Sequence, residues 1–271
     1  MSLRSSSFLL VIVSIATFLA LPGMALADAG SVIPMGDLEQ WTVFSLGGSK
    51  ATDQLGNGTS ISGELGVAGN GKVTLSGNAI VNGNLCYRSN GKLSMAPGAT
   101  VTGGIYNDED SLLDNDVNFA RAAANAALLP PTDPTNNISL NKSNNMSLTG
   151  GSGQTVVLDL KSFKMNGSSL LTLTGAADTT FIINVSSQFS LSANARIVLS
   201  GGLTWNDVVF NARGVGPKVR LSGDSQFQGM LLATQRAVQI RQNALVSGSV
   251  IADSVSLQGT AQLLHPPVVS P

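Results

Sequence analysis

The side chains that most often carry catalysis are scarce in this sequence of 271 residues. It holds one histidine, His265, and one cysteine, Cys86. His265 stands next to Pro266, and Cys86 has no second cysteine with which to form a disulfide. These counts exclude a disulfide-stapled scaffold, a Cys/His zinc site and a Cys–His catalytic pair. Cys86 is expected to be a small buried hydrophobic residue.

Carboxylates are the remaining candidates for catalysis. Paired acids could cleave glycosides, yet the strands expected below contain few acids, Glu64 and Asp224 being the exceptions. Substrate clefts of solenoid enzymes also use aromatic platforms, and the tryptophans and tyrosines are only Trp41, Trp205, Tyr87 and Tyr106. The sequence therefore predicts that the chain is not an enzyme and has no catalytic residues.

An acidic group near position 110 could supply oxygen ligands to calcium. Its spacing departs from that of an EF-hand loop, and no glycine stands at the turn position. Carboxylates at the start of a helix are the favoured interpretation, so we expect no metal and no cofactor. The group consists of Asp108, Glu109, Asp110, Asp114 and Asp116.

A basic group lies in the C-terminal half, with only Asp224 opposing it. It could form a weak stripe for an anionic polymer, but a solvated face is favoured. Overall, 11% of the residues are charged, against roughly 25% in a typical domain, and the net charge is −1. Nucleic acid is therefore not an expected partner. The basic residues are Arg213, Lys218, Arg220, Arg236 and Arg241.

Residues 1–27 have the pattern of a secretory signal peptide. Arg4 precedes an apolar run of about 14 residues, and Ala25-Leu26-Ala27 forms the cleavage motif. A membrane-spanning helix needs about 20 apolar residues, so a transmembrane anchor is the less favoured alternative. We expect cleavage after Ala27 and a secreted location, extracellular or periplasmic, for residues 28–271.

A repeat of about 20 residues organises the rest of the chain. Residues 70–75 (NGKVTL) recur as residues 90–95 (NGKLSM), and the column Ile61, Val81 and Val101 spans three units. Near the C-terminus, residues 219–221 recur as 238–240 and again as 255–257. Apolar residues alternate with polar ones, which is typical of half-buried strands. The repeat predicts a β-solenoid whose turns stack on one another; a β-sandwich with accidental similarity is the alternative.

One alanine-rich segment, residues 111–129, has helical periodicity and is followed by Pro130-Pro131. We expect this helix to lie along the solenoid and cover one aliphatic face. The expected organisation of the single domain, residues 28–271, is then a first array of strands at about 41–107, the helix, a polar loop at 130–145 and a second array at about 146–265.

The outward side chains of the strands form the candidate binding face. A flat sheet whose threonines align in rows (ranks) from strand to strand could order water and bind ice. Only Thr100-Val101-Thr102 has the Thr-x-Thr form. The other ranks mix residue types, and many such columns merely solvate a sheet. The candidate residues are Ser60, Ser62, Asn82, Thr100, Thr102, Gln226, Gln228 and Ser247.

Two stretches resemble known families. Residues 41–44 (WTVF) and 58–67 (GTSISGELGV) are similar to the opening of the secreted bacterial ice-binding-like solenoid family. A run from residue 180 to residue 252, with the motifs TFIIN, NDVVFN and FQG, also resembles the choice-of-anchor A domain of bacterial exported and surface proteins, some of which are described as collagen-binding adhesins. The resemblance implies a right-handed three-sided β-solenoid with a helix alongside and no enzymatic activity. Regular threonine ranks, which would favour ice binding, are missing.

These observations predict a non-enzymatic secreted β-solenoid with a structural or adhesive role in the bacterial envelope or extracellular matrix. Ice binding, as an antifreeze or an inhibitor of ice recrystallisation, is the alternative, and a polysaccharide-active solenoid enzyme is the third. The expected partner is ice or the surface of an extracellular polymer or matrix. The sequence leaves the oligomeric state open.

Overall fold

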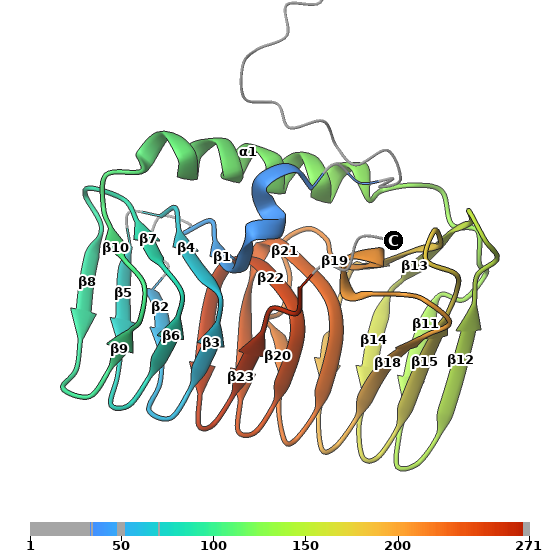
Figure 1. Cartoon of the computed structure of the whole chain (residues 1–271). Coiled ribbons are helices and arrows are strands. Elements are labelled where there is room, and N and C mark those ends of the chain that lie inside the picture. Colours follow the sequence, from blue (N-terminus) through green and yellow to red (C-terminus); the bar gives the residue numbers. More distant parts are fainter. Residues whose placement is uncertain (1–32, 34, 48–51, 70, 268–271) are drawn as a thin grey trace, which may run out of the picture.

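The computed structural model describes residue 33 and residues 35–47, 52–69 and 71–267. The expected signal peptide, residues 1–27, lies outside the described residues. The strands stack into a β-solenoid of about nine turns with one α-helix along its side (Figure 1). The predicted fold class, an all-β solenoid with one flanking helix, is confirmed. No helix in the described part of the chain is long and apolar enough to cross a membrane.

Three ladders of parallel strands form the sides of the solenoid, and we name them faces A, B and C. In the order in which its strands stack, face A contains β12 (Asn145–Thr149), β15 (Leu170–Thr174), β18 (Arg196–Ser200), the first part of β21 (Gln226–Arg241), the first part of β22 (Leu245–Gln258), β23 (Gln262–Leu264), β3 (Ser60–Ser62), β6 (Ile80–Asn82) and β9 (Thr100–Val101).

Faces B and C are built in the same way. Face B contains β11 (Asn137–Leu140), β14 (Ser162–Met165), β17 (Phe189–Leu191), β20 (Val219–Leu221), the last parts of β21 and β22, β2 (Thr52–Leu55), β5 (Lys72–Leu75) and β8 (Lys92–Met95). Face C contains β13 (Thr155–Leu160), β16 (Thr180–Val185), β19 (Val208–Ala212), the middle parts of β21 and β22, β1 (Trp41–Ser45), β4 (Glu64–Val67), β7 (Leu85–Tyr87) and β10 (Ile105–Tyr106).

The turns do not stack in chain order. On face A, Leu263 of β23 is in register with Val246 of β22 on one side and with Ile61 of β3 on the other. On face C, β1 likewise lies between β22 and β4. The first array therefore adds onto the C-terminal turns, and the two arrays that the sequence separates form one stack.

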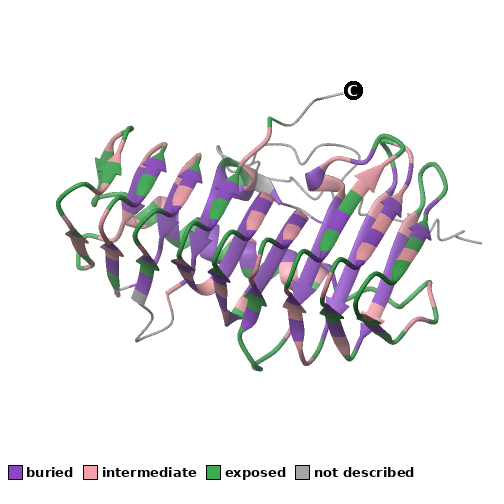
Figure 2. Cartoon of the chain, turned by 90° about the horizontal axis from the view of Figure 1, so that it is seen from below, coloured by how far each residue is buried: buried purple, intermediate pink, exposed green. Residues whose placement is uncertain are grey.

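The strand register explains the sequence repeat. Ile61, Val81 and Val101 are partners on neighbouring strands, which is the offset of 20 residues seen in the sequence. In the second array Val219, Val238 and Val255 are partners in the same way. Because successive side chains of a strand point to opposite sides, one set fills the interior, and Figure 2 shows buried stretches alternating with more exposed ones along the strands.

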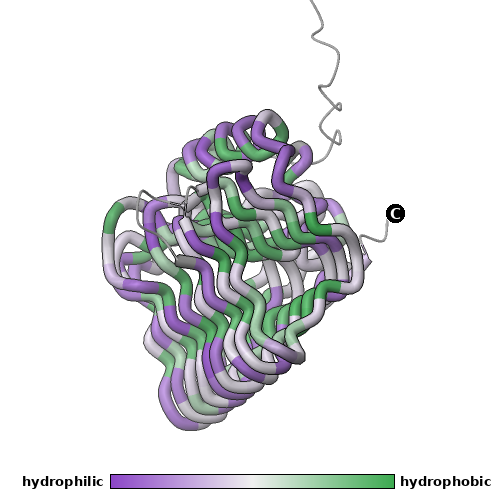
Figure 3. Tube along the Cα trace, turned by 90° about the vertical axis from the view of Figure 1, so that its left-hand side faces the viewer, coloured by the Kyte–Doolittle hydropathy of each residue, from purple (hydrophilic) through white to green (hydrophobic). Residues whose placement is uncertain are grey.

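The helix α1 (Asp110–Ala126) starts one residue before the expected segment and ends before residue 129. Pro130 disfavours helical geometry for the residue before it, which explains why the helix does not reach residue 129. After the two prolines, the amide of Thr132 donates to the carbonyl oxygen of Val157 on β13. The helix buries Leu113, Val117, Ala120 and Ala123 against face C. Seen along the solenoid, α1 lies above a three-sided section (Figure 3).

Three short elements were not anticipated from the sequence. The polar segment at 130–145, expected to be a loop, contains the strand β11 (Asn137–Leu140), because Ile138 and Leu140 alternate with Asn137 and Ser139 over too few residues to stand out. Two 3-10 helices, η1 (Gly36–Gln40) and η2 (Trp205–Asp207), flank face C.

Glycines make the bend between faces A and C possible. Gly229 and Gly248 are register partners with φ of +135° and +140°, values that L-residues rarely adopt. A Cβ at Gly248 would lie 2.1 Å from the carbonyl oxygen of Gly229. The close approach of the stacked backbones therefore requires glycine here.

Candidate functional site

Face C is covered and cannot form an open binding surface. The side chains of α1 and of Ile33, Met35 and Leu38 pack on its outward side. Trp41, Phe44 and Ile251 are buried with them. The indole Nε1 of Trp41 donates to Oδ2 of Asp116 on the helix at 2.9 Å. Faces A and B remain as the two exposed sheets.

The end of the helix is attached to face C by two asparagines. Asn184 on β16 donates from Nδ2 to the carbonyl oxygen of Ala127 at 2.7 Å. Asn211, its register partner on β19, donates to the carbonyl oxygen of Ala124 at 2.9 Å and to Oδ1 of Asn184 at 2.9 Å. These bonds satisfy carbonyls that the last turn of a helix leaves without partners.

Face A is a long and regular surface. Its strands are anchored by an inner row of apolar side chains, for example Leu171, Phe227 and Ile61, which are almost fully buried. Two outward columns flank this row, and all of their side chains are exposed or half-buried. The first column is Asn145, Leu170, Arg196, Gln226, Leu245, Gln262, Ser60, Ile80 and Thr100; the second is Ser147, Thr172, Val198, Gln228, Ser247, Leu264, Ser62, Asn82 and Thr102.

Charge is almost absent from these two columns. Arg196 is the one charged residue in them, and the other positions hold serine, threonine, asparagine, glutamine or an aliphatic residue. Neighbouring strands of a sheet lie about 4.8 Å apart, so small polar and apolar groups recur at this spacing along the whole solenoid. The face is thus a mixed and nearly neutral surface.

All eight candidate residues of the sequence analysis lie on face A. Ser60, Ser62 and Asn82 come from one array, and Gln226, Gln228 and Ser247 from the other. The strand β23 joins the two groups, since it pairs with β22 and with β3. Four further uncharged polar members of the columns are not among the candidates because their strands show no clear repeat of the quoted motifs: Asn145, Ser147, Thr172 and Gln262.

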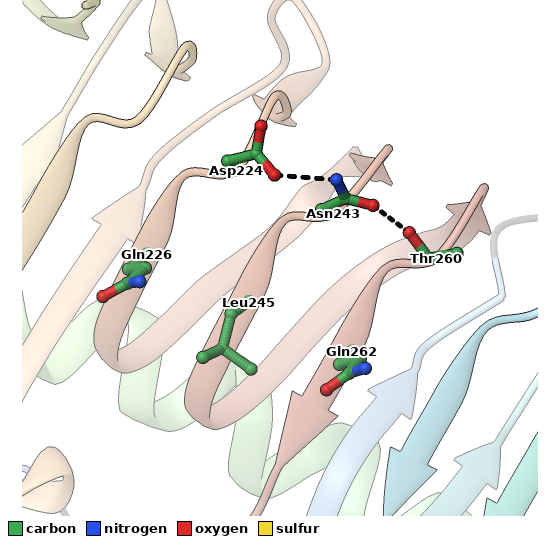
Figure 4. A pocket seen from close by; sticks show the side chains of 6 residues that line it. All are labelled: Asp224, Gln226, Asn243, Leu245, Thr260 and Gln262. Atoms are coloured by element: carbon green, nitrogen blue, oxygen red, sulfur yellow. Dashed lines mark hydrogen bonds between the residues drawn. The ribbon is translucent and has the colours of Figure 1, made fainter. Parts of the chain in front are cut away.

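The corner between faces A and B carries a row of polar side chains beside a shallow hollow (Figure 4). Oδ1 of Asp224 accepts a hydrogen bond from Nδ2 of Asn243 at 2.7 Å, and Oδ1 of Asn243 accepts one from the hydroxyl of Thr260. Gln226, Leu245 and Gln262 of face A line the other side of the hollow. The corner residues are therefore bonded to one another across successive turns and form the rim of face A.

The acidic group near the helix start makes contacts within the protein. Asp110 accepts hydrogen bonds from the amide and hydroxyl of Ser89 at 2.9 and 2.7 Å, which hold the pKa of this carboxyl below its usual value. Asp114 forms an ion pair with Arg88. Among the described residues, no group of three or more histidine, cysteine or acidic side chains could hold a metal ion.

The single histidine and the single cysteine serve packing. His265 lies against Trp205 with ring centroids 4.8 Å apart, and its burial lowers its pKa. Trp205 in turn donates from Nε1 to the carbonyl oxygen of Pro266 at 3.0 Å. Cys86 is buried under α1, and this burial raises the pKa of its thiol to about 11.

The basic group of the second array is divided by the fold. Arg213 pairs with Asp159 on β13 at 2.6 Å. Arg236 was expected on a solvated face, but it is buried and donates to backbone carbonyl oxygens, including those of Gly214 at 2.9 Å and Ser186 at 2.7 Å. Lys218, Arg220 and Arg241 are exposed on face B.

Comparison with known proteins gives one curated relative and several similar structures. An "Ice-binding protein" of Flammulina populicola is 34% identical over 98 residues, which are 36% of this chain and 38% of that protein. The chain thus matches well under half the length of this relative. None of these proteins is named as an enzyme, so a polysaccharide-active enzyme finds no support among them.

The solved structures share the fold at low identity. The ice-binding protein 1 domain of Shewanella frigidimarina has a TM-score of 0.58 at 15% identity, covering 87% of this chain and 98% of that one. The ice-binding protein of Antarctomyces psychrotrophicus has a TM-score of 0.52 at 17% identity, with the same coverage of 87% and 98%.

The match to a family model is more extensive. The model described as "Putative Ice-binding-like adhesive domain" matches residues 30–263, nearly all of the chain after the expected signal peptide. The suspected ice-binding-like solenoid family is therefore confirmed, whereas these comparisons do not test the likeness to the choice-of-anchor A domain. This chain belongs to the ice-binding-like adhesive domain family.

Proposed function

We propose that this protein binds ice through face A. The observation that carries the proposal is the pair of outward columns on nine stacked strands in which Arg196 is the one charged residue. Its support from outside the chain is that the Flammulina populicola relative and the similar solved structures are named as ice-binding proteins.

The prediction of a structural or adhesive role as the main function is contradicted by these comparisons. The proteins that resemble the chain and carry a functional name are ice-binding proteins. Comparison of the turns in chain order reveals only part of face A, because the two arrays join through β23 out of chain order.

The chemistry of face A fits an ordered layer of water. Hydroxyl and amide groups can hydrogen-bond to water at intervals set by the strand spacing of about 4.8 Å. Aliphatic residues between them, such as Leu245, Ile80 and Val198, offer no competing polar group. A charged side chain would hold its own water shell, and stripping that shell is costly, so a nearly neutral face is suited to contact with a solid water lattice.

The same argument disfavours the other two faces. Face C is occupied by α1 and by Ile33, Met35 and Leu38. Face B exposes several cationic side chains, among them Lys164, Arg220 and Lys92. The water bound to these cations would interrupt an ordered water layer at several strands of face B.

Export is the second part of the proposal. It is supported by the order of features in residues 1–27: a basic residue, an apolar run and an A-x-A motif that ends at Ala27. Expression of the full chain in a bacterium should give a protein in the periplasm or medium whose N-terminal residue is Asp28. A mature protein that still begins at Met1 would contradict this part without affecting ice binding.

A matched pair of substitutions tests the choice of face. Ser247 and Ser256 both lie on β22 and are similarly half-exposed, but Ser247 is on face A and Ser256 on face B. We expect Ser247→Lys to remove more than half of the thermal hysteresis of residues 28–271, because it places a charge and its water shell in the middle of face A. Ser256→Lys should leave thermal hysteresis unchanged.

The measurements are thermal hysteresis and ice recrystallisation, with circular dichroism to show that both variants fold. Absence of ice shaping by the unaltered protein at micromolar concentration would refute the proposal. Equal loss of activity in the two variants, or loss in Ser256→Lys alone, would show that face A is not the ice-binding face.

A further inference from the structure

Face B gathers exposed cations that the sequence scatters over 170 positions. Lys164 lies on β14, Arg220 on β20 and Arg241 at the end of β21, while β5 and β8 begin with Lys72 and Lys92. Lys218 directly precedes β20. All six side chains are exposed.

These cations follow the long axis of the solenoid. Face B stacks in the order β11, β14, β17, β20, β21, β22, β2, β5 and β8. Lys164 on the second strand and Lys92 on the ninth are seven strand spacings apart, which is about 34 Å. Arg220 is in register with Gln239, which stands two residues before Arg241 on the next strand. At the far end, Lys72 is the register partner of Lys92.

No carboxylate neutralises this row. In the part of the chain that the structure describes, the ion pairs involve Arg88 and Arg213, and none of the six cations takes part. At the margins of face B stand Asp224, which is bonded to Asn243, and Asp253 at the bend from face C. The other described acidic residues lie on α1, on η1 and on face C or its loops, except Asp53, which is buried on the inner side of β2 in face B.

Unpaired like charges on one face repel one another and attract an extended anion. A ligand that matches this row has to be long, flexible and negatively charged at intervals. The positions between the cations hold small polar side chains that can bond to hydroxyl groups: Ser190, Gln239, Ser256, Gln54, Thr74 and Ser94.

We propose that face B binds an acidic polysaccharide, laid along the solenoid axis with its anionic groups on Lys164, Arg220 and Arg241 and further along on Lys72 and Lys92. A single-stranded nucleic acid is less suited, because its bases need aromatic platforms and face B has no outward aromatic residue. This ligand and ice occupy different faces, so the inference is independent of the proposed function.

Alginate, a chain of uronic acids, is the probe for this inference. Residues 28–271 should bind alginate at about 0.01 M ionic strength, and the dissociation constant should rise at least about fivefold at about 0.15 M, because salt screens exposed charges. Neutral dextran should not bind. Absence of alginate binding at the lower ionic strength would refute the proposal.

Two double variants with the same loss of charge locate the site. Lys164→Gln/Arg220→Gln removes two cations from the second and fourth strands of face B and should weaken alginate binding about tenfold. Arg121→Gln/Arg196→Gln removes one exposed cation from α1 and one from face A. It should change the dissociation constant less than about twofold.

Each remaining outcome has one meaning. Equal weakening in both double variants would show attraction by overall charge and would contradict a site on face B. Binding of double-stranded DNA as tight as that of alginate at equal charge concentration would contradict the choice of a polysaccharide. The Lys164→Gln/Arg220→Gln variant should keep the thermal hysteresis of the unaltered protein, so failure here and failure of ice binding are distinguishable.

Discussion

At the scale of single residues, the most unusual position is a carboxylate inside the solenoid. Asp53 on β2 occupies an inward position, with Val73 and Val255 as its neighbours on the adjoining strands. It is 1% exposed, and Oδ1 accepts a hydrogen bond from the amide of Val255 at 2.7 Å. Desolvation raises the pKa of Asp53 to about 6, although this hydrogen bond and the hydroxyl of Ser45 oppose the rise.

This raised pKa makes stability depend on pH in a defined direction. Between about pH 4 and pH 6 the unfolded chain loses the proton of Asp53 while the folded chain keeps it. The folded state then binds more protons than the unfolded state, so the free energy of unfolding falls as pH rises. The loss is complete above about pH 6 and amounts to about 3 kcal/mol at most.

Substitution of Asp53 isolates this effect. The amide oxygen of Asn can still accept the Val255 hydrogen bond, and the side chain no longer has to be buried as an ion. We expect Asp53→Asn to reduce the drop in unfolding free energy between pH 4 and pH 7 by about 1–3 kcal/mol. Urea denaturation of both proteins at the two pH values measures it; identical pH dependence would contradict a buried, titrating Asp53.

At the scale of elements, the attachment of α1 depends on side chains of the sheet. The last carbonyl groups of the helix have no partners within it, and Asn184 and Asn211 supply donors from two neighbouring strands of face C. The alanines at positions 120, 123 and 127 are fully buried and bring the helix close enough for these bonds. The helix is therefore fixed in position along the stack as well as covering it.

Removal of one donor tests this attachment. Asn184→Ala leaves the carbonyl oxygen of Ala127 and one donor of Asn211 without partners in a buried place. We expect it to lower the free energy of unfolding by about 1–3 kcal/mol. Asn125→Ala, on the exposed side of α1, should change it by less than about 0.5 kcal/mol. Chemical denaturation followed by circular dichroism gives both values, and equal effects would contradict the role assigned to Asn184.

At the scale of the whole molecule, one short strand joins the two arrays. Leu263 of β23 is fully buried between Val246 of the second array and Ile61 of the first. The contact between the two arrays on face A therefore depends on this three-residue strand. This arrangement predicts that the two arrays unfold together.

Truncation of Leu263 tests the coupling between the arrays. Leu263→Ala should lower the free energy of unfolding by about 2–5 kcal/mol through the cavity that it leaves. Hydrogen exchange should quicken on both neighbouring strands, at Ile61 and at Val246. Leu264→Ala, one position along and exposed, serves as the control. Faster exchange in only one array would show that the arrays are not coupled through β23.

The strands and much of face A could be predicted from the sequence. The alternation of apolar and polar residues identifies strands and their inward side chains, and the offset of 20 residues gives the register of Ile61, Val81 and Val101. The eight candidate residues lie on one face because each is the sequence neighbour of an inward apolar residue on its strand. The burial of Arg236 is not predictable in this way, since nothing in the local sequence distinguishes it from the exposed Arg241.

By itself the sequence determined the solenoid, the helix and the low charge of the strands, because these follow from side-chain period and composition over neighbouring residues. Only the tertiary structure decided the order of stacking. Pairing of β23 with β3 joins residues about two hundred positions apart, and no local pattern encodes such a contact. That order makes face A continuous and nearly neutral, aligns the cations of face B, and leaves the helix to cover face C.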